Sequence, residues 1–205
     1  MKTFLSFFMG LILPLAVHGQ EAPDALVKTV TLEVVDLIAK DKDIKAGNRA
    51  KLISLIDAKV LPHFNFQAMT QLAMGQSWNK AQPEQKKRLV AEFKTLLVRT
   101  YASALSAYSE QKFDFRPLRA KPNDTDVVVQ VRVLQPGAQP VPIDYSMEKT
   151  PAGWKVYDVM VGGVSLVANY RTEFNNVVRD SGVDGLIKSL DSKNRSLEAA
   201  GAAKK

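Results

Sequence analysis

The chain has 205 residues, no cysteine, two histidines and a formal net charge of +7. The absence of cysteine excludes disulfides and thiolate metal sites, while the length is that of one domain with a substantial core. The positive charge is modest and spread along the chain, which suits anionic membrane surfaces or acidic proteins better than nucleic acid.

The N-terminus predicts export. Lys2 precedes an apolar run that ends at Val17, and Val17 and Gly19 occupy the −3 and −1 positions of a cleavage site. The pattern is typical of a secretory signal peptide over residues 1–19, because a spanning helix would need roughly 20 apolar residues. We therefore expect a soluble, exported protein whose folded domain covers residues 20–191.

Four helices are predicted in the first half of the chain. Apolar residues recur at helical spacing in the segments Pro23 to Ala39, Asn48 to Leu61, Gln67 to Met74 and Pro83 to Tyr108. The last segment would span roughly 39 Å at 1.5 Å per residue, enough to cross a small domain. Its opposite face is basic, which indicates either ordinary solvation or a docking surface, and it carries Lys86, Lys87, Arg88 and Lys94.

The second half changes to the two-residue period of strands. Four strands are predicted, at Phe113 to Arg119, Asp126 to Leu134, Val141 to Lys149 and Gly153 to Val161. Short turns between them indicate an antiparallel meander. Two helices follow, at Leu166 to Arg179 and Val183 to Leu190, and residues 192–205 are predicted to form a flexible tail. The result is an α+β domain with helices on one face of a curved antiparallel sheet, which can enclose a pocket.

The segment from Gly153 to Phe174 combines an apolar strand, a corner at Gly162–Gly163 and the start of an apolar helix. Such a corner suits glycine, which tolerates unusual backbone angles. An apolar strand, corner and helix can line a hydrophobic cavity, or they can simply form a core. The residues alone leave both interpretations open.

Motifs for nucleotide hydrolysis, serine hydrolysis, zinc proteolysis and dinucleotide binding are absent from the sequence. His63 would be the one histidine left after export, and we interpret it as a surface or capping residue rather than a metal ligand. The alternative enzymatic hypothesis uses Asp158 and a tyrosine such as Tyr157. A carboxylate in an apolar pocket has a raised pKa and can act as a general base, although pairing with an arginine or capping a backbone group is commoner.

Three blocks of sequence resemble the toluene-tolerance family, which is the MlaC family. They are VLPHFNFQAMTQLAMGQSWNKAQPEQKKRLVAEFKTLLVRTYASAL (60–105), VPIDYSMEKTPAGWKVYDVMVGGVSLVANYRTEF (141–174) and GVDGLIKSL (182–190). The resemblance implies a periplasmic, non-enzymatic carrier without cofactor or metal, expected to be a monomer. It would hold phospholipid between an outer-membrane lipoprotein–porin complex and an inner-membrane ABC transporter, in a cone fold similar to nuclear transport factors.

A lipid carrier has to shield its ligand from water. Two acyl chains expose on the order of 30 methylenes, and at about 0.8 kcal/mol each their hydration costs roughly 25 kcal/mol. We therefore expect a deep apolar cavity of about 1,000 Å³, with polar groups only at its mouth. Each residue expected to line it could instead be ordinary core, and the set is Phe93, Leu97, Tyr101, Leu105, Val131, Val133, Tyr145, Met147, Val159, Val161, Val164, Leu166 and Tyr170.

Two further points stay open at the level of sequence. Arg132 and Arg171 are candidates to steer a phosphate near the mouth, although each can equally be an ordinary surface or ion-pair residue. The same apolar set would also suit other hydrophobic ligands, such as solvents, sterols or quinones.

Overall fold

The structure is a computed structural model that describes residues 21–107, 111–121 and 123–202. The signal peptide predicted at 1–19 lies outside the described residues. The helices are α1 (Pro23–Lys40), α2 (Lys42–Lys45), α3 (Arg49–Lys59), α4 (Phe66–Met74), α5 (Pro83–Ala107) and α6 (Ala168–Ala202), with 3-10 turns η1 (Leu61–His63) and η2 (Gly75–Lys80). The strands are β1 (Lys112–Phe115), β2 (Asp126–Leu134), β3 (Val141–Thr150), β4 (Gly153–Val161) and β5 (Val164–Ser165).

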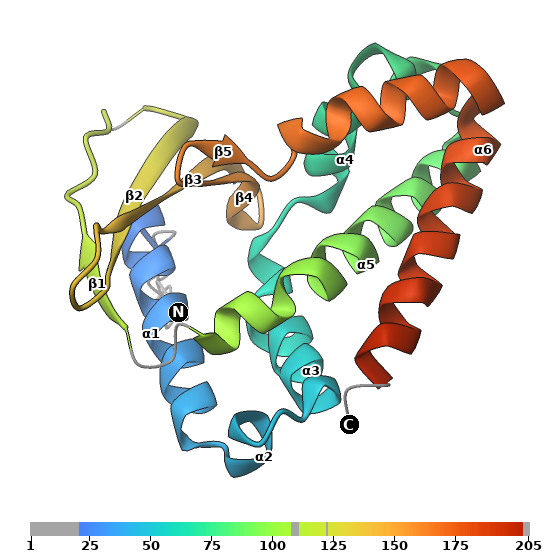
Figure 1. The fold of residues 1–205 in the computed structure, drawn as a ribbon. Coiled ribbons are helices and arrows are strands. Elements are labelled where there is room, and N and C mark those ends of the chain that lie inside the picture. The colour runs from blue at the N-terminus through green and yellow to red at the C-terminus, as the bar shows by residue number, and fades with distance from the viewer. Residues whose placement is uncertain (1–20, 108–110, 122, 203–205) are drawn as a thin grey trace, which may run out of the picture.

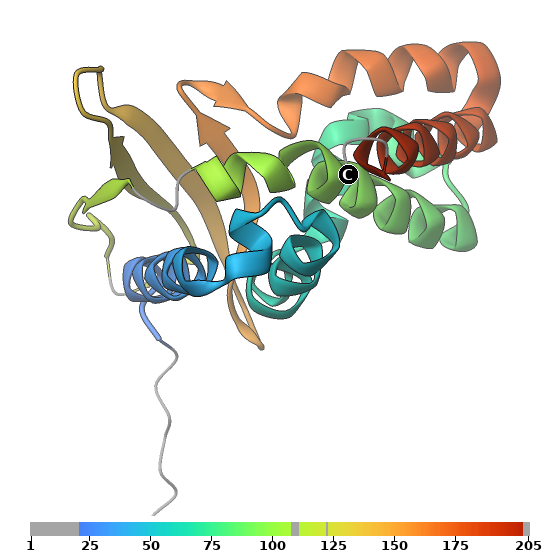
Figure 2. The same ribbon diagram turned by 60° about the horizontal axis from the view of Figure 1, so that its bottom comes forward.

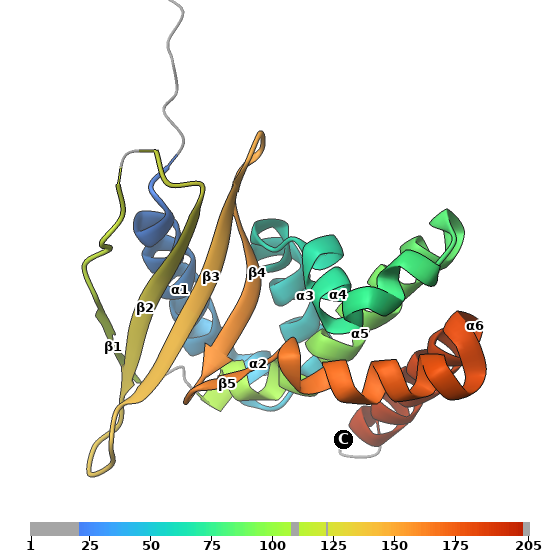
Figure 3. The ribbon, with the colours of Figure 1, turned by 90° about the horizontal axis from the view of Figure 1, so that it is seen from above.

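The five strands form one antiparallel sheet in the order β1-β2-β3-β4-β5. The sheet lies at one end of the molecule and α4 and α6 pack at the other, while α5 runs from one end to the other and α1 crosses the sheet (Figures 1 and 3). The α+β class predicted from the sequence is therefore confirmed. The strand expected to reach Arg119 ends earlier, since Pro117 has no N–H to donate to the ladder.

The alternating burial of side chains along the strands shows which face of the sheet is turned toward the helices. Burial alternates along the whole of β2, as predicted, with Val127, Val129, Val131 and Val133 buried. Tyr145 of β3 pairs with Val159 of β4 on the same inner face. A register shift between Ser146 and Met147 then brings Met147 opposite Val156 rather than Tyr157. This β-bulge re-aims the start of β4, which simple alternation cannot predict.

The helical end has a filled core. Phe93 of α5 meets Tyr170 and Phe174 of α6 edge-on, with ring centroids 5.1 Å apart in both pairs. Around these rings pack apolar side chains of α4, α5 and α6, including Met69 and Leu186, which are almost fully buried. Aromatic pairs in this geometry add to the hydrophobic gain of burial.

Helix α6 bends at Gly182, whose φ of 70° and ψ of −177° break the helix there. Only glycine adopts these angles readily, so the predicted junction between two helices falls at this residue. The polar stretch expected to form a flexible tail continues α6 to Ala202 instead. Its attachment explains the difference, because Asn194 donates to the Glu92 carbonyl at 3.0 Å and Arg99 donates to the Asn194 carbonyl at 2.6 Å.

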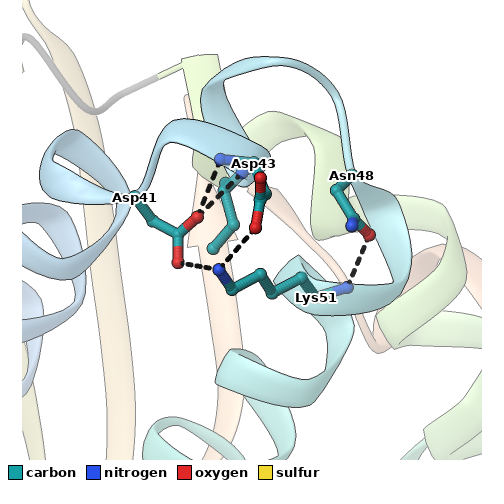
Figure 4. A network of polar contacts seen from close by, with 5 residues as sticks. Asp41, Asp43, Asn48 and Lys51 are labelled. Atoms are coloured by element: carbon teal, nitrogen blue, oxygen red, sulfur yellow. Dashed lines mark hydrogen bonds and ion pairs between the residues drawn. The ribbon is translucent and has the colours of Figure 1, made fainter.

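A polar network fixes the corner between α1 and α3 (Figure 4). Asp41 caps α2 by accepting from the backbone N–H groups of Asp43 and Ile44, at 2.9 and 3.1 Å. Lys51 of α3 forms ion pairs with Asp41 at 2.7 Å and with Asp43 at 2.9 Å. The hydrogen bond from Lys51 is the main cause that lowers the pKa of Asp41. The network holds the end of α1 beside α3, and Figure 2 shows the short turn of α2 that joins these two helices.

Candidate functional site: an apolar cavity between helix α1 and the sheet

A cavity of about 340 Å³ lies between α1, the second half of α5 and the inner faces of β3 and β4. Helix α1 contributes one wall through Leu26, Val27, Val30, Thr31, Val34, Val35 and Ile38. The volume is at the lower end of ordinary ligand pockets, about 300–1,000 Å³, and smaller than the cavity expected for a two-chain lipid.

The lining is almost wholly apolar. Its polar side chains are Thr31, His63, Tyr101 and Tyr145. Burial raises the pKa of Tyr145 to about 12, although a hydrogen bond with Thr31 opposes the rise. The tyrosine therefore stays neutral at physiological pH, and none of the lining side chains brings a fixed charge into the cavity.

The structure brings about half of the predicted residues together. Those that line the cavity are Leu97, Tyr101, Tyr145, Met147, Val159, Val161 and Leu166. They come from α5, β3, β4 and the link to α6, which are segments far apart in the sequence. Within the segment from Gly153 to Phe174, strand β4 and Leu166 thus contribute to the wall.

The remaining predicted residues do not line the cavity. Phe93 and Tyr170 lie in the filled helical core, because α6 covers that part of α5. Val131 and Val133 face inward but are buried beneath their neighbours. Val164, expected inside the cavity, is 51% exposed, because it belongs to β5, the two-residue strand at the edge of the sheet. The side chain of Leu105 lies outside the described part of the structure.

Helix α1 forms a wall of the cavity that is not predicted from the sequence. Its apolar stripe predicts a helix, but nothing in the sequence distinguishes a stripe against a cavity from one against a core. The available signal was its composition: Val27, Val30, Val34 and Val35 are β-branched residues, which are less favourable in helices than leucine. The stripe also contains a threonine, Thr31, in place of a further valine.

The segment around η1 lies at the junction of the cavity with the sheet. Phe64 forms an isolated bridge with Val156, and the Asn65 N–H donates to the Val156 carbonyl at 2.8 Å. Phe64 and His63 both line the cavity here. Burial, together with the positive charge of Lys155, lowers the pKa of His63. His63 therefore belongs to the cavity wall and favours its neutral form.

Asp158, the candidate general base, holds the corner between β4 and α6. Its carboxylate accepts from the Ser165 hydroxyl at 2.6 Å and from the backbone N–H groups of Val159 and Val167 at 2.8 and 3.2 Å. Ser165 in turn accepts from the N–H of Ala168, the first residue of α6. These bonds satisfy donors at the start of a helix, which is a capping role.

The two candidate arginines are placed elsewhere. Arg171 donates through Nε and Nη2 to the Leu72 carbonyl at 3.2 and 3.0 Å, near the end of α4. A cation there satisfies carbonyls that a helix C-terminus leaves unpaired. Arg132 is exposed on the outer face of β2, opposite Asp114 of β1. Neither arginine lines the cavity.

The described residues offer little other chemistry. No cluster of three or more histidine, aspartate or glutamate side chains that could hold a metal occurs among them. Within the same residues, no helix is both long and apolar enough to cross a membrane. An apolar cavity whose lining carries no fixed charge is suited to hydrocarbon chains, which need burial and no specific polar partner.

Comparison with known proteins gives consistent results. The MlaC protein family profile matches residues 28–192. The toluene tolerance protein ttg2D of Pseudomonas putida is 25% identical over 179 residues, 87% of this chain and 82% of that protein. The intermembrane phospholipid transport system binding protein MlaC of Haemophilus influenzae is 24% identical over 68% of this chain and 66% of its own length.

A solved structure is similar as well. It is that of a phospholipid-binding protein from Ralstonia solanacearum in complex with a phospholipid. The two chains are 41% identical and superpose with a TM-score of 0.80, over 87% of this chain and 99% of the other. At 41% identity the two chains are similar in sequence as well as in fold.

Proposed function

The chain belongs to the MlaC family, and we propose that it is a periplasmic carrier that binds glycerophospholipid by enclosing the acyl chains in the cavity beside α1. The observation that carries the proposal is the composition of that cavity. Its walls are apolar on the helical side and on the sheet side alike, and its few polar groups are neutral. Each methylene left exposed to water would otherwise cost roughly 0.8 kcal/mol.

The volume of the cavity has a consequence for loading. A space of about 340 Å³ is too small for two complete acyl chains, so the walls must separate when lipid enters. The interior of the helical core is closely packed and resists such movement. The wall formed by α1 is the better candidate to yield, because α1 is held by two smaller clusters, through Val27 against the sheet and through Val34 and Ile38 against α2 and α3.

We further propose that the protein shuttles lipid between an outer-membrane lipoprotein–porin complex and an inner-membrane ABC transporter. The sequence has no nucleotide-binding motif that could supply energy. The direction of net transport would then be set by the energy-consuming partner. The leader at residues 1–19 would deliver the protein to the periplasm, and the N-terminus of the exported form is expected at Gln20.

Native mass spectrometry of the purified protein tests the binding proposal. We expect a complex of one protein with one glycerophospholipid, identified by fragmentation of the released ligand. A protein that purifies empty and takes up no lipid from phospholipid vesicles would contradict the proposal. A sterol or quinone found in place of phospholipid would show that the protein carries another hydrophobic ligand.

A further inference from the structure

Two side chains that carry hydroxyl groups line the cavity. Thr31 stands on α1 and Tyr145 on β3, so they belong to opposite walls, and both line the cavity. Each interrupts an otherwise apolar row, since Thr31 lies among the valines of α1 and Tyr145 lies between Ile143 and Met147 on the inner face of the sheet.

Packing alone does not explain these hydroxyls. Valine has almost the shape of threonine, and phenylalanine has that of tyrosine, so both positions could be filled without polar atoms. A hydroxyl removed from water costs free energy unless it is hydrogen-bonded. The pair carries two hydroxyl protons, and a hydrogen bond within the pair would use only one of them, which leaves a donor for another acceptor.

The position of the pair suggests what that acceptor is. Ile143, two residues before Tyr145, is only partly buried, whereas Met147, two residues after it, is fully buried. Two residues along a strand correspond to roughly 7 Å. Tyr145 therefore lies between a more open end and a closed end of the sheet wall, where a bound lipid would change from its polar part to hydrocarbon.

We propose that the hydroxyls of Thr31 and Tyr145 bind the ester carbonyl of an acyl chain and so select acyl lipids over alkyl lipids. The inference rests on the proposed function and adds the recognised group. An ester carbonyl accepts hydrogen bonds and donates none, which matches the spare proton of the pair. The other polar residues of the lining are placed differently: Tyr101 packs against the helical core, and His63 lies at the η1 junction.

The experiment compares two phosphatidylethanolamines that differ only in the linkage of their chains. The purified, delipidated protein is incubated with vesicles that contain equal amounts of the diacyl and dialkyl lipid with chains of the same length. Bound lipid is then measured by native mass spectrometry. We expect the wild-type protein to favour the diacyl lipid roughly fivefold, the effect typical of one hydrogen bond.

Tyr145→Phe is expected to remove the preference, and Thr31→Val to reduce it, with thermal unfolding used to confirm that both variants fold. Tyr157→Phe is the matched control and is expected to retain the preference. The Tyr157 hydroxyl lies outside the cavity and donates to Asp126 at 3.0 Å.

Equal binding of the two lipids by the wild-type protein would overturn this inference but leave the carrier function standing. A preference that survives in both Tyr145→Phe and Thr31→Val would overturn it as well. Binding of neither lipid would contradict the proposed function itself, and the inference with it.

Discussion

The two ends of the molecule use similar residues to opposite effect. At the helical end, Phe93 and its neighbours fill the space between α4, α5 and α6. At the sheet end, equally apolar side chains from α1, β3 and β4 leave a cavity. Helix α5 runs through both regions (Figure 1). What separates core from cavity is therefore the covering layer, because α6 packs closely on the first half of α5 whereas α1 and the sheet stand apart beside its second half.

Truncation of one phenylalanine at each end gives the largest expected contrast. Phe93→Ala removes a fully buried ring and should lower the free energy of unfolding by about 4 kcal/mol. Phe113→Ala removes a partly buried ring that already borders the cavity, so a loss of about 1–2 kcal/mol is expected. Urea denaturation followed by circular dichroism measures both. Equal losses would show that the sheet end is packed as tightly as the helical end.

Asp158 joins the two ends, since it ties β4 to the start of α6. Asp158→Ala leaves the Val167 N–H and the Ser165 hydroxyl without their acceptor, and should lower the free energy of unfolding by about 1–3 kcal/mol. The same urea titration detects this loss. An unchanged free energy of unfolding would contradict the capping role and would favour the alternative, a chemical role for this carboxylate.

Arg171 distinguishes a structural cation from one that binds phosphate. Arg171→Met removes two hydrogen bonds to the Leu72 carbonyl and should cost about 1 kcal/mol of stability, because the side chain is exposed. Phospholipid affinity, measured by vesicle uptake, should stay unchanged. Loss of affinity with normal stability would instead place the guanidinium at the lipid headgroup.

The smallest effect concerns His63 in the cavity wall. Its pKa in the folded protein is lowered below the usual value of 6.5, so the unfolded chain binds the proton more readily. Stability should therefore fall as pH drops below about 6.5 and level off below the pKa of the folded state. Thermal unfolding of the wild type and of His63→Gln between pH 5 and 8 tests this. A His63→Gln variant with the same pH dependence in this interval would assign the effect to other groups.

Much of the fold could be predicted from the sequence because its signals are local. The alternating valines of β2 and the apolar stripe of α5 each report which face of an element is buried. What covers that face is not a local property, so Phe93 and Leu97 looked equivalent although only Leu97 reaches the cavity. The bulge at Ser146/Met147 and the pairing of β5 with β4 are likewise not local properties, and the second places Val164 at the exposed edge of the sheet.

Helix α1 allows the most direct test of the central claim that the cavity holds the acyl chains. Val30 lines the cavity, whereas Leu32, two residues later, is 46% exposed on another face of the same helix. Val30→Trp fills the space, and Leu32→Trp adds the same ring outside it. Both variants would be expressed and purified in parallel with the wild type, and bound phospholipid counted by native mass spectrometry.

We predict close to one phospholipid per protein for the wild type and for Leu32→Trp, and at least a tenfold lower occupancy for Val30→Trp with its fold retained. Full occupancy in a folded Val30→Trp protein would contradict the account, because the acyl chains would then have to bind somewhere other than this cavity.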